Sequence, residues 1–104
     1  MRRLLTVVDV DVFDPAAAWE LDPRVAVRPE PFGALLYHFG TRKLSFLKNT
    51  TVVEIVRTLG DHHSAGDAIA ASVAEPDARA PYVHALSTLA GSAMIRRVAS
   101  SPES

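Results

Sequence analysis

Histidine is the residue type in this 104-residue chain that could most readily support chemistry, as a metal ligand or an acid–base group. The four histidines are His38, His62, His63 and His84. His62 and His63 are adjacent, and no pair has the i, i+4 spacing that places two ligands on one helical face. The chain has no cysteine, which excludes thiolate metal sites, disulfides and thiol catalysis. The pattern favours a solvated loop around His62 and structural or surface roles for His38 and His84, so no metal site is expected.

Other catalytic patterns are equally weak. No serine lies in a G-x-S-x-G elbow, and the five glycines are scattered rather than gathered into a phosphate-binding loop. Glu30 lies between two prolines and has no evident carboxylate partner for hydrolase chemistry. The sequence therefore predicts a protein that is not an enzyme and that carries no cofactor.

Size and charge set further bounds. A chain of 104 residues forms one domain, and its formal net charge of -1 gives no global attraction to nucleic acid or to an anionic membrane. Residues 24–57 are locally basic, with six basic side chains against two acidic ones. The start of the chain shows no complete signal peptide, and no apolar run reaches the length of a membrane span. We expect a cytoplasmic protein with no membrane partner.

The elements that must position any site follow from the hydrophobic periodicity. Period-two alternation and turn residues predict strands at 24–28, 34–39 and 44–48, and the period then changes to 3.6 for helices within 49–60, 64–74 and 78–91. Thr51 and Glu54 match a capping box, Gly60 suits the residue after a helix, and Ser64 suits an N-cap. The expected fold class is α+β: a small winged-helix-like domain with a three-stranded antiparallel sheet followed by three helices.

The expected domain occupies residues 19–95. Residues 1–18 form an N-terminal extension that is either disordered or an extra strand, with Trp19 anchoring the segment on the domain, and residues 96–104 form a flexible tail.

Two kinds of partner remain. A winged-helix regulator would need basic residues on its DNA-reading helix, but residues 64–76 have none and the third helix offers only Arg79 near its start. An edge strand at 43–48 could instead accept another chain as an added strand, and Lys43 and Lys48 would discourage self-association and attract an acidic partner. Peptide recognition is the preferred interpretation, and a DNA-binding regulator is the alternative.

The stretch "RPEPFGALLYHFGTRKLSFLK" followed by "TVVEIVRTL" resembles the mycofactocin peptide chaperone family, within the PqqD-like group of precursor-peptide recognition domains. The resemblance covers roughly residues 19–95. It implies three strands followed by three helices and a non-catalytic role. It also implies binding of the leader of a ribosomally made precursor peptide, which is presented to a radical S-adenosylmethionine (SAM) maturase, with no nucleic acid involved.

The same resemblance implies where the leader lies. It would form an added strand beside the third strand, in the cleft toward the third helix. Carried onto this sequence, the peptide-binding residues are Lys43, Leu44, Ser45, Phe46, Leu47 and Lys48 on the strand, with Tyr82, Val83 and Leu86 on the helix. A chaperone domain that serves another modified peptide remains open as a second alternative.

Overall fold

The computed structural model describes residues 12–98, and the expectations for residues 1–11 and 99–104 lie outside this range. The main sheet has the antiparallel order β3-β4-β5. Its strands are β3 (Val25–Glu30), β4 (Gly33–His38) and β5 (Leu44–Leu47). The helices are α1 (Thr50–Thr58), α2 (Ala65–Ser72) and α3 (Ala80–Gly91), with short 3-10 turns η1 (Leu59–Asp61) and η2 (Pro76–Ala78). The predicted α+β fold, three strands followed by three helices, is confirmed.

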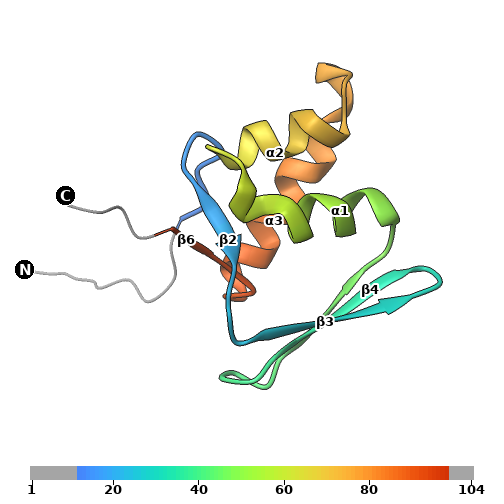
Figure 1. Ribbon diagram of the computed structural model, residues 1–104, viewed down its shortest axis with the longest axis vertical. Helices are drawn as coiled ribbons and strands as arrows, with labels where there is room; N and C mark the ends of the chain where they lie inside the picture. Colours follow the sequence, from blue (N-terminus) through green and yellow to red (C-terminus); the bar gives the residue numbers. More distant parts are fainter. Residues whose placement is uncertain (1–11, 99–104) are drawn as a thin grey trace, which may run out of the picture.

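The helices cover only one face of the sheet (Figure 1). Along β4, Ala34, Leu36 and His38 are buried on the face toward the helices. Their neighbours across the ladder share this face, because directly opposed residues in an antiparallel pair point the same way. Leu47 lies opposite Ala34 and Ser45 lies opposite Leu36, so these two residues of β5 face the helices.

A second, two-stranded sheet closes the other side of the core. β2 (Trp19–Leu21) pairs antiparallel with β6 (Ile95–Arg97). This pairing was not predicted, because strands of three residues are too short to show alternation. The last strand reaches Arg97, beyond the boundary at residue 95 that the sequence suggested.

Trp19 lies at the centre of this closure. Its side chain is fully buried, its indole Nε1 donates to the Asp14 carbonyl at 2.9 Å, and its ring centroid lies 5.1 Å from that of Phe13. The predicted anchoring role of Trp19 is therefore confirmed. The core around it contains the other large, fully buried apolar side chains, Leu36, Ile55, Leu59, Ile69, Leu86, Met94 and Ile95.

The helix boundaries differ in part from the sequence signals. Asn49, not Thr51, caps α1, since its side-chain Oδ1 accepts a hydrogen bond from Val52 N at 2.8 Å. The chain continues from α1 into η1 through Leu59, so Gly60 does not terminate a helix in the predicted manner. Ser64 caps α2 as predicted, with its Oγ accepting from Asp67 N at 3.0 Å.

Gly33 is the backbone position on which the approach of β4 to β5 depends. Its φ is 155°, in the region that favours glycine, and a Cβ built there would lie 1.9 Å from the Leu47 carbonyl oxygen. A side chain at this position would therefore push the end of β5 away from β4. Gly91, at the end of α3, has nothing within 4 Å of such a Cβ.

The Gly33→Ala variant should lose stability by about 2 kcal/mol or more, because it combines a steric clash with an unfavourable backbone conformation. Gly91→Ala is the matched control and should be neutral or slightly stabilising, since alanine is favoured over glycine in helices. Chemical denaturation of both variants checks this. Equal midpoints for the two would contradict the role assigned to Gly33.

Candidate functional site

β5 is an edge strand with one free side. Among the described residues it pairs only with β4. His38 N donates to the Lys43 carbonyl at 3.0 Å, which makes His38 and Lys43 a hydrogen-bonded pair. Because such pairs alternate along an antiparallel ladder, the backbone N–H and C=O groups of Leu44 and Phe46 point away from β4. We call this free side of β5 the open rim.

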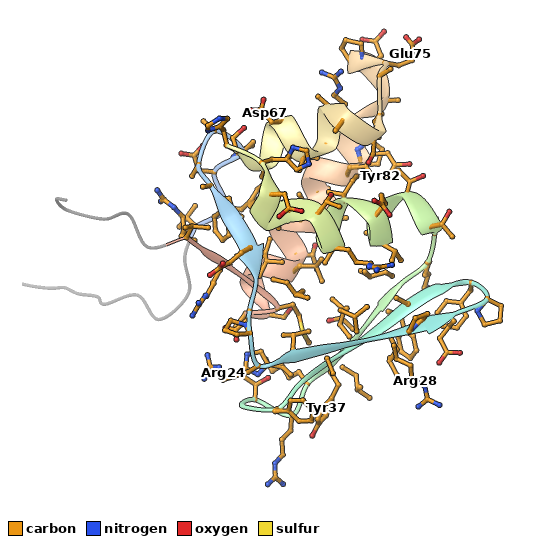
Figure 2. All side chains as sticks on the ribbon, viewed as in Figure 1. Arg24, Arg28, Tyr37, Asp67, Glu75 and Tyr82 are labelled. Carbon is orange, nitrogen blue, oxygen red and sulfur yellow. The ribbon has the colours of Figure 1, made fainter. Side chains whose placement is uncertain are left out.

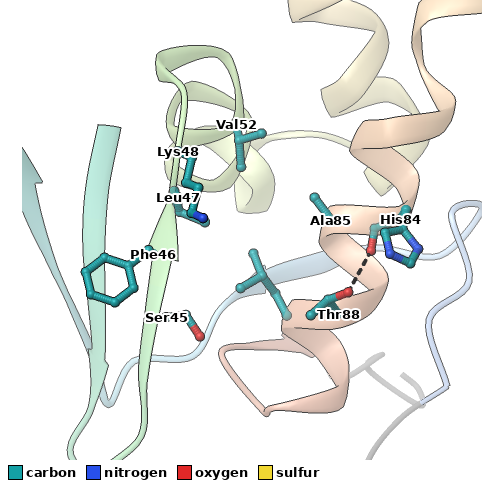
Figure 3. A pocket seen from close by; sticks show the side chains of 9 residues that line it. Ser45, Phe46, Leu47, Lys48, Val52, His84, Ala85 and Thr88 are labelled. Carbon is teal, nitrogen blue, oxygen red and sulfur yellow. Dashed lines mark hydrogen bonds between the residues drawn. The ribbon is translucent and has the colours of Figure 1, made fainter. Parts of the chain in front are cut away.

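A cleft of about 600 Å³ lies beside the open rim, between β5 and α3 (Figure 3). Its floor is apolar: Leu47, Val52 and Leu89 are all buried. The described residues that line it are Ser45, Phe46, Leu47, Lys48, Val52, His84, Ala85, Thr88 and Leu89. The cleft is thus formed by one short strand, the first turn of α1 and one face of α3.

Polar groups surround the apolar floor. Thr88 Oγ1 donates to the His84 carbonyl at 3.1 Å, so its hydroxyl hydrogen is used within α3 (Figure 3). His84 and Lys48 are exposed, on α3 and just after β5 respectively. No carboxylate among residues 12–98 lines the cleft. The arrangement suits an extended chain that offers backbone groups to the rim, apolar side chains to the floor and a negative charge to Lys48.

The predicted strand residues divide between two environments. Ser45, Phe46, Leu47 and Lys48 line the cleft, whereas Lys43 and Leu44 are exposed at the start of β5 and do not line it. Phe46 contributes at the rim, but its ring lies on the side of β5 opposite to α3 (Figure 3). Leu47, which is 4% exposed, serves the core as well as the cleft.

The predicted helix residues lie on the neighbouring face of α3. Leu86 is 1% exposed in the core, and Tyr82 and Val83 are half-buried against the core. None of the three lines the cleft. The cleft wall is formed instead by His84, Ala85, Thr88 and Leu89. Hydrophobic periodicity predicts the face of the helix that packs into the core. The residues of the cleft wall are mostly small or polar, so this signal does not detect them. Only the i, i+1, i+4 spacing of His84, Ala85 and Thr88 indicates that they share one face of the helix.

A buried polar cluster supports the turn that leads into β5. His38 is fully buried, and its Nδ1 accepts hydrogen bonds from Gly40 N at 2.9 Å and Thr41 N at 3.0 Å. These bonds require a neutral imidazole with its hydrogen on Nε2. Nε2 lies 3.8 Å from Asp22 Oδ2 and makes no hydrogen bond. His38 therefore has a structural role, as a buried core histidine that stabilises the turn.

Asp22 completes this cluster. Its Oδ1 accepts from Arg24 N at 2.8 Å and from Arg24 Nε at 3.2 Å. The hydrogen bonds from the Arg24 side chain hold the pKa of Asp22 below its ordinary value, against the opposing effect of burial. The charged carboxylate is thus the form that the folded chain favours.

Residues 12–98 were also compared with the requirements of a metal site, a DNA-reading helix and a membrane-spanning helix. No group of three or more His, Asp or Glu residues there could hold a metal ion. Arg79, the basic residue near the start of α3, donates to the carbonyls of Val73 at 2.8 Å and Ala74 at 2.9 Å, at the end of α2. Its guanidinium is therefore engaged within the chain. None of the helices in this part of the chain is long and apolar enough to cross a membrane.

Fold and site together define a winged-helix-like α+β domain with an open strand rim beside an apolar cleft. The model of the peptide chaperone MftB family matches residues 18–96. The chain therefore belongs to the peptide chaperone MftB family, and the resemblance to mycofactocin peptide chaperones is confirmed. The members of this family are named as peptide chaperones, which is a non-catalytic role, and the prediction that the chain is not an enzyme is confirmed.

The curated relatives agree over most of the chain. The peptide chaperone MftB of Mycobacterium ulcerans (strain Agy99) is 55% identical over 102 residues, covering 91% of this chain and 94% of the relative. That of Mycolicibacterium smegmatis is 58% identical over 89 residues, with coverage of 86% and 87%. That of Mycobacterium tuberculosis (strain H37Rv) is 56% identical over 87 residues, with coverage of 84% and 80%. No solved structure matches the chain.

The Asp22→Asn variant should be less stable than the parent by about 1–2 kcal/mol at pH 7, because it loses charge-assisted hydrogen bonds in a buried position. Since the pKa of Asp22 is lowered in the folded chain, its contribution is present above the unfolded value of about 3.9 and is lost as pH falls through the folded value. The difference between parent and variant should therefore be constant above about pH 5 and shrink below about pH 4.

Denaturation at a series of pH values measures this difference, with Asp77→Asn, at an exposed position, as the control. A difference that stays the same down to pH 3 would show that the charge of Asp22 is not what stabilises the turn.

Proposed function

We propose that this chain binds the leader of the mycofactocin precursor peptide by β-strand addition at the open rim and presents the peptide to a radical SAM maturase. The observation that supports the proposal most strongly is that an unpaired edge strand borders an apolar cleft. An exposed strand edge offers a row of backbone groups that another chain can pair with. Because the chain belongs to a family of peptide chaperones, we expect its partner to be a peptide.

The rim would fix the path of the bound peptide. Its backbone would pair with the outward N–H and C=O groups of Leu44 and Phe46, as a fourth strand beside β5. Alternate side chains of an added strand point to opposite faces, so every second peptide residue would enter the cleft. Lys43, Leu44, Ser45, Phe46, Leu47 and Lys48 would then form the strand side of the site. On the helix, His84, Ala85 and Thr88 replace the predicted Tyr82, Val83 and Leu86 as the residues nearest the peptide.

Backbone pairing alone would not hold a flexible leader. Ordering a disordered segment costs about 2–5 kcal/mol, and a net backbone hydrogen bond contributes about 1 kcal/mol, so a handful of such bonds roughly cancels the cost. Affinity must therefore come from apolar anchors on the floor of the cleft, near Leu47, Val52 and Leu89. Lys48 would favour a leader with an acidic residue at the mouth of the cleft.

The rest of the pathway would lie outside this chain. The iron–sulfur clusters and S-adenosylmethionine would belong to the maturase, and the chaperone would contribute binding and position only. We expect the complex to form in the cytoplasm and to involve no nucleic acid.

The Ala85→Phe variant tests the proposal by filling the cleft without changing the rim. Ala85 is half-buried on the cleft wall, whereas Ser87 is exposed on the same helix and does not line the cleft. Calorimetric titration with the precursor peptide should show at least tenfold weaker binding for Ala85→Phe, equivalent to about 1.4 kcal/mol, and an unchanged affinity for Ser87→Phe.

Equal affinities for the two variants would contradict the cleft as the peptide site. Absence of measurable binding to the parent chain would contradict the proposed function itself. Thermal unfolding of both variants shows whether each remains folded at the titration temperature.

A further inference from the structure

The face of the main sheet that points away from the helices is apolar, and no element within residues 12–98 covers it. Four of its side chains are exposed: Phe32 by 46%, Phe39 by 64%, Leu44 by 56% and Phe46 by 59%. Half-buried Leu35 and Tyr37 lie between them, opposite Phe46 and Leu44 in the ladder. We call this surface the outer patch; it consists of Phe32, Leu35, Tyr37, Phe39, Leu44 and Phe46. Tyr37 and Arg28 project on this side, away from the helices (Figure 2).

The outer patch and the cleft meet at Phe46 but lie on opposite faces of the sheet. Consecutive residues of β5 serve the two surfaces in turn, since Ser45 and Leu47 face the helices and Leu44 and Phe46 face outward. A peptide bound in the cleft would therefore leave the outer patch uncovered. Contiguous exposed apolar surface of this kind marks an interaction site more often than a solvated face.

The aromatic rings of the patch pack against each other in pairs. Tyr37 and Phe39 pack edge to face with centroids 5.1 Å apart, and Phe32 and Phe46 are tilted at 6.1 Å. Rings that pack against each other, with aliphatic Leu35 and Leu44 between them, form a continuous apolar surface. Single-stranded nucleic acid would instead favour separate ring faces on which bases can stack. The patch thus suits the surface of a folded protein.

Charges around the patch select the partner. Arg28 lies opposite Leu35 on β3, Lys48 borders Phe32 and Phe46, and Arg42 lies in the turn between β4 and β5. Residues 24–48 contain five basic side chains and one acidic one, Glu30, which pairs with Arg28 at 3.2 Å. A second copy of this chain would bring like charges together. A partner with an apolar area bordered by carboxylates would be complementary.

We propose that the outer patch is the docking surface for the maturase, which would present an apolar area bordered by acidic residues. This inference rests on the proposed function, because it takes the partner from it. The place of the docking surface follows from the alternation of side chains along β5. One face of this strand would contact the peptide, and the other face would contact the enzyme.

The added peptide strand would extend the sheet, so its outward side chains would continue the outer patch. The maturase should therefore bind the chaperone–peptide complex more tightly than the chaperone alone, and by linkage should strengthen peptide binding by the same factor.

The test uses a double variant, Tyr37→Thr with Phe39→Thr. Both positions lie on the outer patch and neither lines the cleft. Threonine keeps a strand-favouring side chain while removing the aromatic surface. Val12→Thr is the matched control, because Val12 is 80% exposed and outside the main sheet. Calorimetry with purified maturase, with and without precursor peptide, gives the dissociation constants.

The double variant should bind the maturase at least tenfold more weakly while its affinity for the peptide alone stays unchanged, and Val12→Thr should match the parent in both. Equal maturase binding by the double variant and the parent, or no maturase binding by the parent that still binds peptide, would overturn the outer patch as the docking surface. Failure of the parent to bind peptide would instead count against the proposed function.

Two further measurements distinguish other occupants. Sedimentation that shows a dimer of the parent chain and a monomer of the double variant would assign the patch to self-association. Binding of a single-stranded oligouridine by the parent and not by the double variant would assign it to nucleic acid. Either result would overturn the inference.

Discussion

The unpaired backbone of β5 is the constraint around which the rest of this small domain is arranged. A strand with a single neighbour leaves half of its N–H and C=O groups without a partner inside the sheet. In many proteins a helix or loop covers such an edge. Here α3 stands off from β5 and leaves a cleft with an apolar floor. The open rim and the cleft adjoin each other. Under the proposed function, the rim would pair with the peptide backbone, and the floor would supply the apolar contacts that backbone pairing alone does not.

The position of this strand is fixed from both ends. At its start, buried His38 accepts hydrogen bonds from the turn, and Asp22 and Arg24 lie against it. At its end, Gly33 allows the Leu47 carbonyl to approach closely, and Asn49 caps the helix that follows at once. With both of its ends held in this way, β5 offers its free backbone groups to a partner strand in a single register. Its alternating side chains then supply two different surfaces, the cleft and the outer patch, within four residues.

The order of elements could be read from the sequence because the change from period two to period 3.6 is sharp near residue 49. The orientation of β5 could not, since Leu44 and Phe46 on one face are as apolar as Leu47 on the other. The comparisons confirm the family resemblance from which the peptide-binding residues were predicted. The predicted strand residues Ser45 to Lys48 line the cleft, whereas the predicted helix residues lie on the face of α3 that packs toward the core. The structural role of His38 depends on hydrogen bonds from Gly40 N and Thr41 N to its Nδ1, which hydrophobic periodicity does not reveal.

Amide hydrogen exchange along β5, followed by NMR with and without the precursor peptide, tests strand addition most directly. In the free chain the amides of Ser45 and Leu47 point toward β4 and should exchange slowly, whereas those of Leu44 and Phe46 point to the open rim and should exchange fast. Saturation with peptide should slow Leu44 and Phe46 and leave Ser45 and Leu47 protected as before. Fast exchange of Leu44 and Phe46 in the saturated complex would contradict the account, because the peptide would then be bound somewhere other than the rim.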